Sequence, residues 1–314
     1  MKLGLDSINI ILMIASCALA YVLPFELVLL SYAFLGPAHY LTQISWMHDR
    51  QYFTGHHWLW IPGSIITMLL IWIVFAKNAD TNYVYALYAL AIIASAIALL
   101  KNRMHIVATA LLCAIIMAAL WFLSAEFAKG LTILLPTVVH IYVFTGCFIL
   151  FGALKSGSKM GFLSFAIYLA CAGMFFLITP HYIMYMPQFV SGGNEMFQGV
   201  ADYLAQILSF GGWIDEHAML GFLSFAYTYH YLNWFSKAEI IKWHKIPKLR
   251  LAIIVTIYLA AIGLYLINYQ LGFLALLFLS LLHVILEFPL NIYTFRELGR
   301  LGLMRFKPHS QPVP

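Results

Sequence analysis

Charged side chains are scarce in this sequence of 314 residues. Asp, Glu, Lys and Arg make up 9% of it, whereas 63% of its residues are hydrophobic. A soluble domain carries about 25% charged residues, so this chain lacks the side chains needed to cover a water-facing surface. It contains many apolar runs of about 20 residues, the length that crosses a bilayer. The composition therefore predicts an all-α polytopic membrane protein.

Several sequence motifs with known chemistry are also missing. The chain has no Walker loop and no GxGxxG motif, which gives no support to ATP-driven or dinucleotide chemistry. None of its four cysteines has CxxC spacing, and all lie inside apolar runs, where we expect small core residues rather than disulfides. No internal repeat is evident, so residues 1–314 are interpreted as a single integral membrane domain. The net charge of +5 follows from membrane topology, described below, and does not indicate nucleic-acid binding.

The apolar runs predict a helical bundle of about ten transmembrane spans. The predicted spans are residues 6–22, 24–41, 58–76, 82–100, 104–124, 131–153, 160–179, 217–236, 250–268 and 271–292. The first resembles a signal peptide but is interpreted as an uncleaved helix. Residues 180–216 are predicted to be an external loop with an amphipathic helix lying on the membrane face. Residues 306–314 are predicted to be a disordered tail.

The basic residues predict how these spans are oriented. When the N-terminus is placed in the cytoplasm and the spans alternate, only Lys77 and Lys129 of the 17 basic residues fall outside. The other 15 lie inside, and an excess of Lys and Arg marks the cytoplasmic side. An even number of spans then places both termini in the cytoplasm.

Twelve histidines are many for so apolar a chain. Four of them lie in the middle or cytoplasmic half of four different predicted spans: His39, His140, His230 and His283. Polar groups at this depth are costly and usually face a cavity, a partner or an ion. A single buried histidine can instead bond to a neighbouring helix, but four at matched depth predict a shared metal or cofactor site.

A carboxylate accompanies this histidine set. Glu287 follows His283 by four residues, so both lie on one helical face. It is a candidate catalytic residue, either as a further metal ligand or as the group that orients an imidazole. Imidazole-rich sites with a carboxylate and open positions suit non-haem iron(II). The sequence therefore predicts an iron site with one or two ions.

The other histidines and the aromatics give weaker signals. We interpret His48, His56 and His57 of the polar loop as solvated, with a place in the site left open. Tyr227 and Tyr231 share a helical face and could form the wall of a site for an elongated apolar substrate. Four further histidines are expected to be positioned by the membrane interface or the tail: His105, His181, His217 and His309. Trp234 is expected to belong to an interfacial aromatic belt.

These motifs resemble those of the bacterial Brp/Blh-type β-carotene dioxygenases, polytopic membrane proteins with histidine-bound iron. The early "LGPAHY" is similar to their Gly-Pro-His motif, with His39 in the histidine position. "HAMLGFLSFAYTYHYLNWF" is similar to a later family helix, with His230 in the ligand position, and His140 and His283 match the two other histidines. The resemblance implies an iron enzyme of the bacterial inner (cytoplasmic) membrane. It also implies oxidative cleavage of a polyene such as a carotenoid.

Other functions fit the same residues. A lipid hydroxylase or desaturase would share the iron, the dioxygen, the membrane lipids and the apolar substrate. A proton-coupled transporter could use buried histidines and Glu287 as a relay, because histidine titrates near neutral pH. Haem held by two of the buried histidines is a third possibility.

Overall fold

The computed structural model describes residues 4–76, 80, 82–121, 130, 133–181, 191–209, 213–237 and 246–306, and within these ranges every regular element is helical. In chain order the elements used below are α1 (Leu5–Val22), α2 (Pro24–Leu30), η1 (Ser31–Leu35), α3 (Gly36–Asp49), η2 (Gln51–Phe53), η3 (His57–Leu59), α4 (Trp60–Phe75), α5 (Tyr83–Leu99), α6 (Arg103–Trp121), η4 (Leu135–Phe144), α8 (Thr145–Ser156), α9 (Lys159–Leu177), α10 (Ser191–Leu208), α11 (Glu216–Ser236), α13 (Lys248–Ile267) and α14 (Tyr269–Phe306).

Six helices in the described part of the chain are long and apolar enough to cross a membrane. They are Leu5–Val22, His57–Phe75, Leu135–Ser156, Lys159–Leu177, Lys248–Ile267 and Tyr269–Gly302. This finding confirms the prediction of a helical fold with helices able to span a membrane. The other four predicted spans also fall on helices, but a ten-span arrangement and the orientation of the termini stay predictions.

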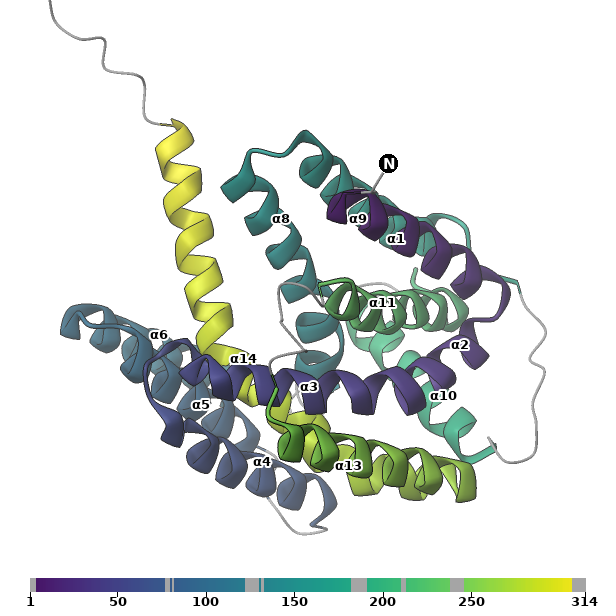
Figure 1. The fold of residues 1–314 in the computed structure, drawn as a ribbon, viewed down its shortest axis with the longest axis horizontal. Helices are drawn as coiled ribbons and strands as arrows, with labels where there is room; N and C mark the ends of the chain where they lie inside the picture. The colour runs from purple at the N-terminus through teal and green to yellow at the C-terminus, as the bar shows by residue number, and fades with distance from the viewer. Residues whose placement is uncertain are drawn as a thin grey trace, which may run out of the picture.

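The bundle is built around α11. This helix begins at the cap Asp215, whose side chain accepts a hydrogen bond from the backbone N–H of His217. Nearly all of its side chains are buried, and it packs against α1, α2, α9, α10 and η4. Figure 1 shows α11 enclosed by these elements. A helix that is buried all round can carry polar residues inward on several faces, which is why a site can be built on it.

The long helix α14 joins the other half of the bundle to this centre. It packs against α3, α4, α5, α8 and α13, and in Figure 1 its last turns extend beyond them. Pro289 lies within it. Because proline has no N–H, the helix loses one internal hydrogen bond there. His283 and Glu287 lie in the turns just before this proline, where α14 faces the interior.

The second predicted span is longer than the sequence indicated. The prediction placed its end at residue 41. Instead the helix continues through Pro37 to Asp49, and the preceding residues Ser31–Leu35 form a π-helical turn. Proline is tolerated here because it lies in the first turn of α3, where the wider π turn precedes it.

The segment predicted as an external loop contains the expected helix, α10. Its face carrying Phe197, Ala201, Leu204 and Ala205 is buried in the main hydrophobic core rather than lying free on a surface. Residues 182–190 and 210–212 of this segment, and residues 307–314 of the predicted tail, lie outside the described residues.

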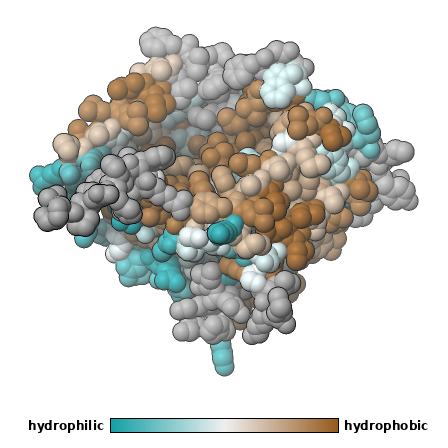
Figure 2. Space-filling view, turned by 90° about the horizontal axis from the view of Figure 1, so that it is seen from above, coloured by the Kyte–Doolittle hydropathy of each residue, from teal (hydrophilic) through white to brown (hydrophobic). Residues whose placement is uncertain are grey.

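The outer surface of the helices is strongly apolar. Met68 and Trp72 of α4 are each 62% exposed, and Leu111 and Ile115 of α6 are exposed as well. Figure 2 shows hydrophobic side chains covering much of one face of the molecule, with hydrophilic side chains toward its margins. An apolar surface of this extent suits contact with lipid.

Candidate metal centre

The four histidines predicted to share a site come together in the structure. His39, His140, His230 and His283 each offer a ring nitrogen, and these four nitrogens all lie within 4.8 Å of one another. The side chains are buried, with 1%, 1%, 7% and 5% of their surface exposed. Each comes from a different element: α3, η4, α11 and α14. In the part of the chain that the structure describes, these four histidines form the group of metal-binding side chains that could hold an ion.

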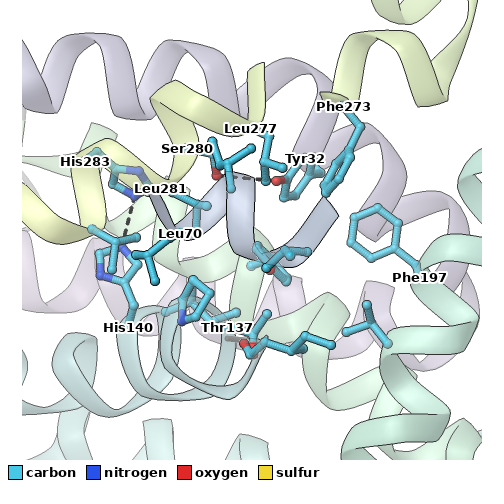
Figure 3. A pocket seen from close by; sticks show the side chains of 18 of the residues that line it. Tyr32, Leu70, Thr137, His140, Phe197, Phe273, Leu277, Ser280, Leu281 and His283 are labelled. Carbon is cyan, nitrogen blue, oxygen red and sulfur yellow. Dashed lines mark hydrogen bonds between the residues drawn. The ribbon is translucent and has the colours of Figure 1, made fainter. Parts of the chain in front are cut away.

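The histidines meet through their Nε2 atoms. His140 Nε2 lies 3.0 Å from His283 Nε2, as Figure 3 shows, and His230 Nε2 lies 3.0 Å from His39 Nε2. A divalent ion bound tetrahedrally at about 2.0–2.1 Å holds its nitrogen ligands about 3.3 Å apart. The observed spacing therefore fits one metal ion after small side-chain movements. The donor set also fits, because imidazole suits iron, zinc and copper.

Wide helical turns place two of the ligand candidates. His140 lies inside the π-helical segment Leu135–Phe144, and His39 follows the π turn Ser31–Leu35 by four residues. A π turn adds a residue to the turn and rotates the following side chains about the helix axis, and such turns are frequent at functional sites. Pro136 starts the longer segment, and the Thr137 hydroxyl donates to the backbone carbonyl of Ile133. Thr137 thus satisfies a carbonyl within the altered turn.

The outer Nδ1 atoms of two histidines have partners that would orient the rings. His230 Nδ1 lies 2.8 Å from the Thr145 hydroxyl oxygen. His140 Nδ1 lies 3.5 Å from a carboxylate oxygen of Glu287, and the Gln43 side-chain amide donates to the same oxygen over 2.8 Å. A histidine that binds metal through Nε2 carries its proton on Nδ1, and such partners fix that tautomer. His140 Nδ1 makes no hydrogen bond at this distance, so Glu287 would have to move slightly closer to orient His140.

His39 is enclosed by aromatic rings. Its imidazole contacts Tyr231 and Trp234, with ring centroids 5.2 and 5.5 Å away. The Trp234 indole N–H donates to the Thr42 hydroxyl over 3.0 Å. The interpretation of Trp234 as an interfacial belt residue therefore misses its main contacts, which hold α11 against α3 beside the candidate metal site.

An apolar cavity of about 220 Å³ adjoins the histidines. His140, His230 and His283 lie in its wall. Tyr227 and Tyr231 also line it, as expected for the wall of an apolar site. Figure 3 shows Tyr32, Phe197 and Phe273 gathered at the end of the cavity away from His140 and His283. Three candidate ligands thus face a space lined mainly by aromatic and aliphatic side chains. This space is named the apolar cavity below.

The apolar cavity reaches the exposed apolar surface of the protein. Val74 and Phe75 line it, and 53% and 57% of their surfaces are exposed. Both residues end α4, whose outer face is among the most apolar of the protein. A molecule dissolved in lipid could therefore approach the histidines laterally, without passing through water.

The other histidines that the structure describes lie apart from this centre. His48 and His57 contact each other with ring centroids 5.3 Å apart, and His48 Nδ1 lies 3.3 Å from the Tyr52 hydroxyl. His56, His105 and His181 are exposed. His217 lies 3.1 Å from its neighbour Asp215 at the start of α11. His244 and His309 lie outside the described residues.

Two residues that orient the histidines were not predicted as part of the site. Gln43 follows His39 by four residues and so shares its helical face, which is a signal that the sequence does carry. Thr145 follows His140 by five residues and bonds to a histidine of another helix. Only the packing of η4, which continues directly into α8, against α11 reveals this contact.

We expect the Thr145→Val substitution to weaken metal binding by about tenfold or more, because partners of this kind typically affect metal affinity by 10- to 100-fold. Valine keeps the shape of the side chain but removes the hydroxyl that meets His230 Nδ1. Competition with a chelator of known affinity measures the change. Thr67→Val on α4 is the matched control, because Thr67 is also buried and its hydroxyl bonds to a backbone carbonyl of its own helix, that of Gly63. Equal affinity in both variants would contradict the orienting role of Thr145.

Comparisons with protein-family models, with curated proteins and with solved structures find no match for this chain. What the site can do therefore has to be argued from its own residues: four imidazoles that could hold one metal ion, two orienting partners, and an apolar cavity against three of the imidazoles.

Proposed function

We propose that this protein is a membrane-embedded non-haem iron oxygenase that acts on an apolar, lipid-soluble substrate. The observation that carries the proposal is the position of the four-histidine cluster, which faces the apolar cavity. An iron ion held by imidazoles supplies activation of dioxygen. The protein contributes a buried, preorganised ligand set and a cavity that excludes water from the reacting carbon atoms.

The size and lining of the apolar cavity support a hydrocarbon substrate. An engineered apolar cavity of about 150 Å³ binds benzene, so a cavity of about 220 Å³ holds a segment of a lipid or polyene chain. The rest of a long molecule would extend past Val74 and Phe75 into lipid. Tyr227 and Tyr231 would hold the chain against the histidines, and Glu287 would act by orienting His140.

Oxidative cleavage of a polyene is the reaction class that we favour. Cleavage of one carbon–carbon double bond by one dioxygen molecule gives two carbonyl products, each with one oxygen atom, and needs no external electron donor. The resemblance of "LGPAHY" and "LLHVILEF" to the Brp/Blh-type dioxygenases supports this choice. Hydroxylation of a lipid chain would use the same cavity but needs a reductant.

The geometry gives less support to haem. The four histidine rings contact one another in pairs, and the centroids of the paired rings are 4.6–5.4 Å apart. They are packed edge to face, and all four compete for one small space. A porphyrin plane would have to fit between two axial imidazoles, and the other two imidazoles occupy that region.

Iron-loaded protein in lipid nanodiscs should bleach a conjugated polyene such as β-carotene in the presence of air. The expected result is a loss of visible absorbance that requires both iron and dioxygen, with carbonyl products identified by mass spectrometry. Metal-free protein in air and loaded protein under nitrogen are the controls. Oxygen uptake with hydroxylated lipid as the product would show that the reaction is lipid hydroxylation rather than polyene cleavage. No oxygen uptake with polyenes or lipids would refute the oxygenase.

A further inference from the structure

A second cavity of about 210 Å³ lies against the histidine cluster and is named the polar chamber here. His39 and His230 of the cluster form part of its wall. Its other lining residues combine polar side chains with aromatic and aliphatic ones: Gln43, Trp46, Thr145, Phe148, Phe151, Asn233, Trp234, Lys237, Glu287 and Leu290. His230 is the residue that lines both cavities.

The two cavities lie on opposite sides of the histidines along the helices. On α14 the apolar cavity is lined by residues from Phe273 to Val284, whereas the chamber is lined by Glu287 and Leu290. On α11 the chamber continues from His230 to Lys237, where the helix ends. Trp46, Lys237 and Leu290 are half-buried, so this wall of the chamber reaches the protein surface near the basic helix ends.

Gln43 presents an unused oxygen beside the histidines. Its side chain is 3% exposed, and its amide nitrogen donates to Glu287. Its Oε1 atom is buried and has no hydrogen-bond partner among the described residues. A buried acceptor without a partner is costly, and a carbonyl oxygen is a ligand for divalent cations. Glu287, held by the same amide, adds a carboxylate next to it.

A metal ion has to reach four nitrogens that are nearly closed off from water. The apolar cavity is a poor route, because transfer of an ion into a space lined by hydrocarbon carries a large desolvation penalty. The polar chamber instead offers the Gln43 and Glu287 oxygens together with the imidazoles of His39 and His230. Oxygen ligands along such a path replace water as the ion loses its hydration shell.

We infer that the polar chamber is the route by which a divalent metal ion is loaded into the four-histidine site. In this route Gln43 Oε1 and the Glu287 carboxylate bind the ion transiently before it passes to the imidazoles. The inference rests on the metal site of the proposed function. The two cavities then admit different molecules. The ion arrives through the polar chamber, and the apolar substrate arrives from lipid through the apolar cavity.

Lys237 provides a second test of the route, because its removal should change the loading rate in the opposite direction from removal of Gln43. Its side chain lines the chamber at the end of α11, and its charge acts on the Glu287 carboxylate of the same chamber. A positive charge there repels an incoming cation. Loss of this charge should speed loading, whereas loss of the Gln43 oxygen should slow it. If the ion entered through the apolar cavity, neither change would alter the rate of loading.

Stopped-flow mixing of metal-free protein with Co²⁺ tests the inference, since cobalt absorbance reports ligation by the histidines. Leu290→Trp in the chamber and Leu277→Trp in the apolar cavity are matched plugs on α14. We expect Leu290→Trp to slow uptake about tenfold through overpacking of the chamber and Leu277→Trp to leave it unchanged. Gln43→Leu should also slow uptake, and Lys237→Met should speed it about fivefold through lost repulsion.

Final cobalt content, measured by elemental analysis, separates failure of the route from failure of the site. One cobalt per chain with equal rates in wild type, Gln43→Leu and Leu290→Trp would overturn the loading route alone. Slower uptake in Leu277→Trp, or in Lys237→Met, would overturn it as well. No cobalt bound by the wild type at any time would overturn both the site and its loading route.

Discussion

Replacement of His140 by glutamine should abolish metal binding and, with it, oxygenase activity. Glutamine has a similar size, so the buried space stays filled, but the imidazole that pairs with His283 and faces Glu287 is lost. Even groups that only orient a ligand change metal affinity by 10- to 100-fold, so we expect loss of a direct ligand to cost about 100-fold or more. Metal content after dialysis and the initial rate of polyene bleaching measure the two effects.

The matched control for His140→Gln is His105→Gln on α6. His105 is exposed and lies apart from the cluster, so its replacement should leave metal content and activity unchanged. Helix content by circular dichroism should be the same for both variants. Full metal occupancy in His140→Gln would show that His140 is not a ligand and would reduce the site to three histidines.

Obstruction of the apolar cavity should block the substrate without removing the metal. Leu277 lines the cavity on α14, and Leu277→Trp adds bulk where the hydrocarbon chain would lie. Overpacking of a well-filled site costs about 1–3 kcal/mol, which corresponds to about 5- to 150-fold weaker binding. The expected result is a rise in KM for the polyene with unchanged iron content.

Leu274→Trp serves as the control for this substitution. Leu274 lies on the same helix, but 44% of its surface is exposed and it does not line the cavity. The control should therefore keep wild-type kinetics. Equal impairment in the two variants would mean that bulk on α14, rather than the cavity, limits the reaction.

The sequence predicted the helices well because their signal is local. Apolar runs fixed α1 and α9 to within two residues at either end. The matched depth of His39, His140, His230 and His283 depended on the topology of these runs. Their meeting within 4.8 Å follows from helices packed side by side at a common level.

Other features of the site depend on contacts between distant segments and could not be predicted. The π turns before His39 and around His140 are set by packing, because nothing in a hydrophobic run distinguishes a π turn from an α turn. Trp234 was interpreted from composition as an interfacial residue, and its bond to Thr42 arises where α11 meets α3. The two cavities are properties of the whole bundle.

Elemental analysis of the protein purified from membranes, combined with its visible spectrum, tests the central claim most directly. The account predicts one iron ion per chain and no Soret band, with the iron lost in His140→Gln and retained in His105→Gln. A Soret band would mean that the histidines hold haem. A protein that contains no metal, and takes up none when iron(II) is supplied, would contradict the account.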